Sequence, residues 1–228
     1  MSDKLLQFLS YFRERNFYTP TTLIDIGAYQ GTFTNTIRKA FPDLPTILIE
    51  PNHHPELEQI SNATWHQKVL YHSEVEVPWY SNNSAGDSVY KENTHFYTTI
   101  NPTTVKATTL DTLLPTMPKD LFLKIDTQGA EIDILRGGTN TLAKTTLLLL
   151  EVPLLGKYNN TPHTFQDYID YVAEHNFAIF DMVDFIRAPF IPYTVQADML
   201  FVNKGSRLYR HIMNDLDSVL NISFEAPL

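Results

Sequence analysis

The chain of 228 residues alternates short, mostly apolar runs with segments of helical periodicity. The clearest runs cover residues 22–27, 46–50, 121–126 and 146–151, and their apolar residues stand at consecutive positions rather than at every second one. Such runs are typical of strands buried on both faces, and strands that alternate with helices pair in parallel. The pattern therefore predicts an α/β fold with a doubly wound, mostly parallel sheet.

Further elements complete the expected order along the chain. An amphipathic N-terminal helix is expected within residues 1–20, over 3–15, because Leu5, Leu9 and Phe12 share one stripe. No linker rich in Pro, Gly or Ser divides the sequence, so residues 1–228 are expected to form a single domain. The remaining predictions are helices over 32–41, over 56–60 and from Gln128 onward, a helical turn over 110–114, a helix capped by Thr164 and Asp167, and strands over 65–70, 74–80, 178–183 and 199–202, with an antiparallel strand closing the sheet.

Composition excludes several classes of function. Lys and Arg number 17 against 26 Asp and Glu, giving a formal net charge of −9, which disfavours binding to nucleic acid through its phosphates. The sequence has no cysteine, so thiolate catalysis, disulfides and cysteine-based metal sites are excluded. No stretch approaches the ~18 apolar residues of a membrane span, and no signal peptide is recognisable. We therefore expect a cytoplasmic protein without a membrane span.

A glycine turn follows the first predicted strand, in the order Asp25, Gly27 and Gly31. Tyr29 occupies the second glycine position of a dinucleotide fingerprint, and no lysine follows Gly31 as a phosphate-binding loop requires. Glu50 ends the next strand, where an acid accepts hydrogen bonds from the hydroxyl groups of a ribose. These residues indicate a ligand that carries ribose but presents no phosphate to the turn.

The amino-acid sequences of four segments are more specific than the spacing of the glycines and acidic residues. They are residues 25–34 (DIGAYQGTFT), 49–51 (IEP), 109–113 (TLDTL) and 122–131 (FLKIDTQGAE), followed by two glycines at 137 and 138 and by Glu151 at the end of a strand. Together they resemble the FkbM-type family of S-adenosylmethionine-dependent methyltransferases, from about Leu23 to Val152. The resemblance implies a class I methyltransferase (Rossmann-like) fold and methyl transfer to a hydroxyl oxygen, often on a sugar or natural product.

The same resemblance implies which residues bind the cofactor. Glu50 would hold the ribose, and Val69 and Leu70 would flank the adenine. Asp25, Gly27 and Gly31 would shape the methionine end and the approach of the adenosine. The full set of expected cofactor-binding residues is Asp25, Gly27, Ala28, Gly31, Thr32, Phe33, Glu50, Val69, Leu70 and Asp126.

Four charged residues are candidates for catalysis: Lys124, Asp126, Glu131 and Glu151. Asp126 closes a strand at the sheet edge that also holds Asp25 and Glu50, although an aspartate there can also cap the next helix. Glu131 falls in the first turn of that helix, where the macrodipole favours a carboxylate regardless of catalysis. Lys124 is either a solvated or a paired charge, and Glu151 either faces the substrate or does not.

A polar segment over residues 81–99, rich in Asn, Ser and aromatic side chains, is expected to be an insertion that binds the acceptor. Its candidate substrate-binding residues are Asn82, Asp87 and His95. We expect replacement of these three residues to impair turnover and to leave the affinity for the cofactor unchanged. The adjacent His53 and His54 are more typical of a surface than of a metal site, and no metal is expected.

The sequence thus predicts an S-adenosylmethionine-dependent O-methyltransferase that acts on a small-molecule or glycan hydroxyl. Asp126 would serve as the general base, provided that burial, Glu131 or Glu151 raises its pKa. One alternative is a metal-assisted enzyme in which Asp126 and Glu151 hold a divalent cation, but two carboxylates are few for a hard cation that takes about six oxygen ligands. A non-catalytic nucleoside-binding protein and a nucleic-acid methyltransferase are further alternatives. Acceptor identity and oligomeric state stay open.

Overall fold

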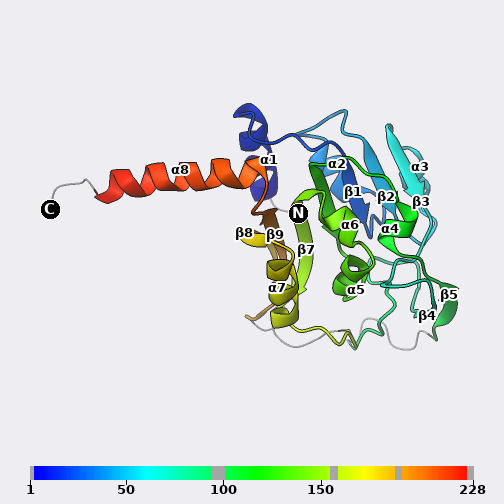
Figure 1. The fold of residues 1–228 in the computed structure, drawn as a ribbon. Helices are drawn as coiled ribbons and strands as arrows, with labels where there is room; N and C mark the ends of the chain where they lie inside the picture. Colours follow the sequence, from blue (N-terminus) through cyan, green and yellow to red (C-terminus); the bar gives the residue numbers. More distant parts are fainter. Residues whose placement is uncertain (1–2, 94–100, 155–158, 188–191, 225–228) are drawn as a thin grey trace.

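The computed structural model describes residues 3–93, 101–154, 159–187 and 192–224. A seven-stranded sheet has the strand order β3-β2-β1-β6-β7-β9-β8 (Figure 1). All pairings from β3 to β7 are parallel, β9 is antiparallel to β7, and β8 is antiparallel to β9. The predicted fold class and the antiparallel closing strand are confirmed. The strands are β1 (Leu23–Ile26), β2 (Thr46–Ile49), β3 (Ala63–His66), β6 (Leu121–Ile125), β7 (Thr145–Pro153), β8 (Phe177–Arg187) and β9 (Thr194–Asn203).

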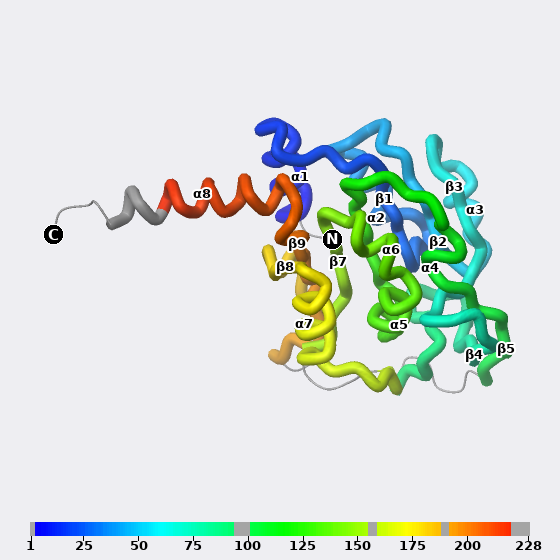
Figure 2. The backbone as a smooth tube through the Cα atoms, in the orientation of Figure 1, coloured from blue at the N-terminus to red at the C-terminus, as the bar shows by residue number. Residues whose placement is uncertain are grey.

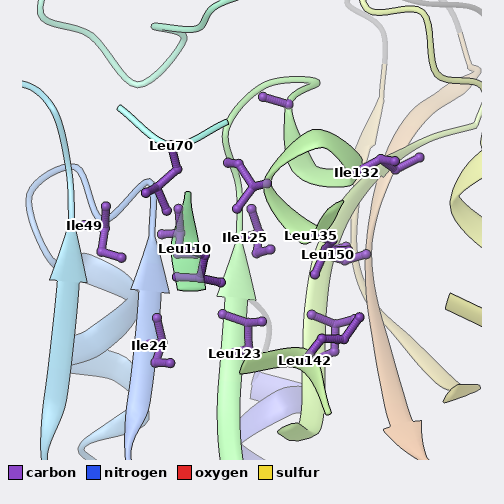
Figure 3. Packing of buried hydrophobic residues seen from close by; sticks show 14 of the residues in the cluster. Ile24, Ile49, Leu70, Leu110, Leu123, Ile125, Ile132, Leu135, Leu142 and Leu150 are labelled. Atoms are coloured by element: carbon purple, nitrogen blue, oxygen red, sulfur yellow. The ribbon is translucent and has the colours of Figure 1, made fainter. Parts of the chain in front are cut away.

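Helices cover both faces of this sheet, as continuously apolar strands require. The helices are α1 (Asp3–Glu14), α2 (Thr32–Ile37), α3 (Pro55–Glu58), α4 (Leu110–Leu113), α5 (Glu131–Arg136), α6 (Thr139–Leu142), α7 (Phe165–Glu174) and α8 (Arg207–Phe224). One core cluster joins α1, α2 and the start of α8 to strand residues such as Leu23 and Phe122. The other joins the helices α4 to α7 to the opposite face, where Ile125 and Leu150 meet Ile132 and Leu135 (Figure 3).

Two helix predictions are confirmed closely. The N-terminal helix, expected over 3–15, is α1 (Asp3–Glu14), and its buried residues are Leu5, Leu9 and Phe12. Helix α7 starts with the predicted cap, because the Thr164 backbone N–H donates to the Asp167 carboxylate at 2.6 Å and the Thr164 hydroxyl accepts from the Asp167 N–H at 3.4 Å. Both helices are thus specified by local sequence: α1 by a stripe of apolar residues on one face, and α7 by a capping box at its start.

The helix expected from Gln128 instead begins at Glu131. Gln128 and Gly129 have φ angles of 59° and 107°, which no α-helix contains. The turn is held by the Glu131 carboxylate, which accepts hydrogen bonds from the N–H groups of Thr127 at 2.8 Å and Gly129 at 3.1 Å. Because the helix starts so late, Ala130 precedes it and Asp126 is not its cap; the capping alternative for Asp126 was wrong.

Other element boundaries also differ from the predictions. Strand β3 ends at His66, so Val69 and Leu70 lie beyond it rather than inside a strand over 65–70. The predicted strand 74–80 is β4 (Glu76–Trp79), and it pairs with β5 (Thr103–Lys106), which was not predicted, in a separate antiparallel sheet. Strands β8 and β9 are longer than expected, and their pairing contains register shifts.

Helix α8 was not predicted either, and it extends away from the sheet, as the tube view shows (Figure 2). Leu208 near its start is buried, whereas Leu216 and Val219 farther along are 50% and 63% exposed. None of the helices in the described ranges is long and apolar enough to cross a membrane.

Candidate functional site

A cavity of about 310 Å³ opens where the carboxyl ends of β1, β2 and β6 meet the loops that follow them. Sites in open α/β sheets lie at this edge, and the volume is at the lower end of the range for small-molecule pockets. Of the predicted site residues, those that line the cavity are Gly27, Ala28, Thr32, Phe33, Glu50, Val69, Leu70, Asp87, Lys124 and Asp126. Asp25, Gly31, Asn82, Glu131 and Glu151 do not line it, and His95 lies outside the described residues.

The turn between β1 and α2 needs its glycines for packing. Gly27 and Gly31 have φ angles of 72° and 76°, a region that favours glycine. A Cβ atom on Gly27 would collide with the backbone carbonyl oxygen of Asp126, and one on Gly31 would collide with the side chain of Ile60. Gly31 therefore makes room for the segment after α3, and its part in shaping the cofactor site stays a prediction.

Glu50 stands at one end of the cavity and is 6% exposed. Its Oε2 accepts a hydrogen bond from the N–H of Tyr29 at 3.0 Å, and its Oε1 accepts one from the N–H of Asn52 at 2.9 Å. Burial raises the pKa of Glu50, although the two N–H groups oppose that shift. Each oxygen keeps further acceptor capacity, so the carboxylate is fixed in place and can still bind a hydroxyl group.

Apolar side chains form the wall beside Glu50. Ile49, Val69 and Leu70 line the cavity and are each at most 7% exposed. Trp79 of β4 lines the same space. The wall is apolar, which suits a purine ring, and the contact of Val69 and Leu70 with adenine stays a prediction.

The polar segment after β4 shares this cavity instead of forming a separate site. Ser84, Ala85 and Asp87 line it together with Glu50. The Asp87 carboxylate organises the segment, because it accepts hydrogen bonds from Asn52 Nδ2 at 2.6 Å, Ser81 Oγ at 2.5 Å and the Asn83 N–H at 3.0 Å. The exposed Asn82 contributes its backbone N–H to Asp87 at 3.1 Å.

Asp25 is fully buried behind the cavity. Its Oδ1 lies 3.1 Å from Lys124 Nζ, and its Oδ2 accepts a hydrogen bond from the Thr34 hydroxyl at 2.8 Å. Lys124 Nζ also donates to the Gly27 carbonyl at 2.7 Å and lies 3.7 Å from Asp126 Oδ2. Burial acts to lower the pKa of Lys124, but the charges of Asp25 and Asp126 outweigh it and raise the pKa. Lys124 is a paired charge, and the solvated alternative was wrong.

Glu131 is also fully buried, and its contacts are structural. Besides the two N–H groups of the 127–129 turn, it accepts a hydrogen bond from the Tyr168 hydroxyl of α7 at 2.5 Å. Burial raises its pKa. Its carboxylate thus shapes the turn that carries Asp126 toward the cavity.

Carboxylates gather at the other end of the cavity. Gln128 Nε2 donates hydrogen bonds to Asp126 Oδ1 and to Glu151 Oε2, both at 3.0 Å. Asp198 of β9 stands opposite Glu151 in the sheet and lines the cavity with Asp126. Burial, reinforced by the charge of Asp126, raises the pKa of Glu151 well above its ordinary value and that of Asp198 to about 6.

Sequence reasoning did not select Asp198. A signal was present, because Asp198 directly precedes the predicted strand 199–202, at the end that an antiparallel strand presents to the carboxyl edge of its parallel neighbours. In the described ranges, no group of three or more His, Asp or Glu side chains is arranged to hold a metal ion.

The chain matches a known protein family over more than half of its length. The sequence model of the methyltransferase FkbM domain matches residues 25–179. The chain belongs to the FkbM methyltransferase family. This match includes the glycine turn, Glu50 and Asp126, and it confirms the resemblance seen in the sequence. No curated protein matches the chain.

One solved structure supports the fold, and two further ones are similar at lower scores. An FkbM methyltransferase from Methylobacillus flagellatus KT superposes with a TM-score of 0.50 at 15% identity, over 85% of this chain and 47% of that one. The 228-residue chain therefore spans about half the length of the Methylobacillus protein. Magnesium protoporphyrin IX methyltransferase from Synechocystis PCC 6803 with bound SAH gives 0.47 at 10% identity, over 86% and 80% of the two chains. Precorrin-6y C5,15-methyltransferase from Geobacter metallireducens GS-15 gives 0.42 at 10% identity, over 82% of each.

Methyltransferases of the FkbM family use S-adenosylmethionine. The residues present fit this cofactor, because a fixed carboxylate with spare acceptor capacity lies beside an apolar wall. Glu50 would hold the ribose hydroxyls. Val69 and Leu70 would contact the adenine, and the turn around Gly27 would hold the methionine part together with Asp126.

Proposed function

We propose that this protein is an S-adenosylmethionine-dependent O-methyltransferase whose acceptor is a hydroxyl group of a sugar, a glycan or a small natural product. One observation carries the proposal: a single cavity has Glu50 at one end and the carboxylates of Asp126 and Asp198 at the other. Two strand spacings of roughly 4.8 Å separate β2 from β6, which Asp126 follows, and four separate β2 from β9. Across the sheet, Asp126 therefore lies about 10 Å from the Glu50 end and Asp198 about 19 Å from it.

The two ends suit different tasks. Glu50 and the apolar wall would bind the nucleoside, which is common to substrate and product forms of the cofactor. The Asp126 end would receive the acceptor. When bound, S-adenosylmethionine supplies an activated methyl group, so the protein's own task is to align the acceptor oxygen and to remove its proton.

Asp126 is the proposed proton acceptor. Its side chain is 38% exposed while lining the cavity, and Gln128 and Lys124 fix its orientation. Glu131 and Glu151 lie outside the cavity lining, which leaves them supporting roles. As the acceptor hydroxyl oxygen gains the methyl group, its proton would pass to the Asp126 carboxylate.

A hydroxyl-bearing acceptor is supported by the side chains at the Asp126 end. Asp126, Thr127 and Asp198 line the cavity there, and their carboxylates and hydroxyl group can form hydrogen bonds with the hydroxyl groups of a sugar or polyol. This acceptor class also agrees with what the family resemblance implies.

Transfer of a radiolabelled methyl group from S-adenosylmethionine to a panel of methyl glycosides, polyols and phenols tests the proposal. Asp126→Asn is expected to lower the turnover of the best acceptor by ~10²–10⁴, as for a lost general base. Activity should survive exhaustive treatment with EDTA. Asp170→Asn is the control, because Asp170 is an exposed carboxylate of α7 away from the cavity.

Calorimetry separates binding from turnover. Wild-type protein should bind S-adenosylmethionine, and Glu50→Ala should lose roughly 1.5–3 kcal/mol of that binding free energy, the value of a hydrogen bond to a charged group. Binding without methyl transfer to any acceptor would favour a nucleoside-binding protein. Loss of activity in EDTA, restored by magnesium, would favour the metal-assisted reaction.

A further inference from the structure

Apolar side chains of helix α8 share one face of the helix between residues 208 and 219. They recur at intervals of three or four residues, the spacing of a single helical face, and are Leu208, Tyr209, Ile212, Met213, Leu216 and Val219. Leu208 is buried at the start of this face. Farther along, where the helix extends away from the sheet (Figure 2), Met213, Leu216 and Val219 are 38%, 50% and 63% exposed. The second half of the apolar face therefore lies in water.

The domain holds α8 along one edge of this face. The His211 ring stacks on the ring of Phe17 with the two centroids 4.2 Å apart, and Asp215 Oδ2 accepts a hydrogen bond from the Tyr11 hydroxyl at 2.7 Å. His211 and Asp215 are one helical turn apart, so they lie on the same edge, next to Leu208. These contacts leave the opposite edge of the apolar face open.

Two residues of opposite charge border that open edge. Arg210 and Asp217 stand beside Met213 on the helix surface, and both are exposed. They are seven residues apart, so they lie on the same edge, separated by about 10 Å along the helix axis. The open edge is therefore positive toward the start of the helix and negative toward its end.

This pattern is complementary to itself when two such helices run in opposite directions. In an antiparallel pair the same edge of each helix meets, so Arg210 of each copy comes beside Asp217 of the other. In a parallel pair each residue stands at the height of its own copy, and the two charges would stay about 10 Å apart. Exposed ion pairs contribute little energy, so the charges select the orientation and the burial of Met213 and Leu216 supplies most of the attraction.

We infer that the exposed part of α8 is a dimerisation surface, and that α8 of a second copy of this chain covers it in antiparallel orientation. The midpoint between Arg210 and Asp217 lies next to Met213, so the two-fold axis of the dimer passes close to that residue. Each copy uses the same patch once, which closes the assembly at two chains. None of the residues that line the cavity belongs to α8, so the surface is separate from the candidate site.

Sedimentation velocity at protein concentrations between about 1 and 100 μM tests the dimer. The wild-type mass should rise with concentration from 26.2 kDa toward twice that value. Leu216→Glu should weaken the dimer by about a hundredfold or more, because each dimer loses two buried leucines. Asn214→Glu is the matched control: Asn214 is exposed on the polar face of α8, so the same new charge there should leave the dissociation constant unchanged. Far-UV circular dichroism and the thermal midpoint verify that both variants fold.

Exchange of the two charges tests the orientation. Arg210→Asp and Asp217→Arg should each weaken the dimer by about tenfold or more, because like charges then meet at both ends of the pair. An equimolar mixture of these two variants should associate like the wild type, and so should the double variant. A wild type that stays monomeric, a Leu216→Glu variant that dimerises like Asn214→Glu, or a mixture that associates no better than its components would overturn the antiparallel pairing.

Discussion

The two ends of the cavity differ in how they hydrogen-bond a largely buried carboxylate. Glu50 is anchored by the backbone N–H groups of Tyr29 and Asn52, one on each oxygen. Asp198 receives no hydrogen bond from a described residue and faces other carboxylates across the sheet. The first arrangement suits a neutral hydroxyl group, whereas the second leaves a charge that a cationic ligand can compensate.

This difference has a structural origin. The Glu50 end is built from neighbouring parts of the sequence, namely the β1–α2 turn and the residues after β2. The Asp198 end requires β9 to lie antiparallel to β7, with Asp198 opposite Glu151. The Glu50 end is thus preorganised by local backbone, and the Asp198 end holds a charge imbalance that lowers stability until a ligand compensates it.

The strongest test of this comparison removes Lys124, the cation beside Asp25 and Asp126. Lys124→Met should lower the free energy of unfolding by about 3–5 kcal/mol, because it leaves the fully buried Asp25 without its ionic partner. Denaturant titration measures the loss. Lys68→Met is the matched control, since Lys68 also lines the cavity but is exposed, and it should change stability by less than about 0.5 kcal/mol.

A double variant sharpens the result. Asp25→Asn combined with Lys124→Met removes both charges, so it should recover part of the stability that Lys124→Met loses. Equal stability of Lys124→Met and Lys68→Met would show that the buried pair does not hold the Asp126 end together.

The second prediction concerns pH and the cost of Asp198. Its folded pKa of about 6 lies above the unfolded value of roughly 3.9. Well below pH 4 the residue is protonated in both states and costs nothing. Between pH 4 and pH 6 the unfolded chain releases the proton first, so stability falls as pH rises and then levels off.

Asp198→Asn should remove this part of the pH dependence. After allowance for partial solvent screening, the variant should be about 1–2 kcal/mol more stable than the wild type at pH 7.5 and equal to it near pH 4. Chemical denaturation at the two pH values measures the difference. A variant less stable than the wild type at pH 7.5 would mean that Asp198 is compensated within the fold and that the two ends are alike.

The alternation of strands and helices and the glycine turn could be predicted from the sequence, because each depends on neighbouring residues. Asp198 could not be assigned to the site in the same way, because its position there depends on the pairing of β9 with β7, about 50 residues earlier in the chain. The start of α5 at Glu131 could not be predicted from the sequence for a different reason. It depends on the Glu131 side chain binding the backbone of the preceding turn, which competes with helix formation at Gln128.

The segment after β4 shows the same limit. Its polar composition predicted a loop, but the hydrogen bonds from Asn52 and Ser81 to Asp87 fold it over the Glu50 end. Composition could not reveal that this loop lines the same cavity as Glu50. The expectation that changes in the loop leave cofactor affinity untouched therefore needs revision for Asp87.

The smallest predicted effect tests that shared cavity. Asp87→Ala removes the acceptor that gathers Asn52, Ser81 and the N–H of Asn83, so Ser84 and Ala85 lose their fixed position beside Glu50. We expect affinity for S-adenosylmethionine to fall about five- to tenfold, or roughly 1–1.4 kcal/mol, with an equal loss for S-adenosylhomocysteine because the damage is at the Glu50 end. Asn82→Ala is the control: its side chain is exposed and does not line the cavity, and its backbone N–H to Asp87 is retained. If Asp87→Ala binds both compounds like Asn82→Ala, the loop serves the acceptor alone; if it weakens one compound more than the other, the two ends are not independent.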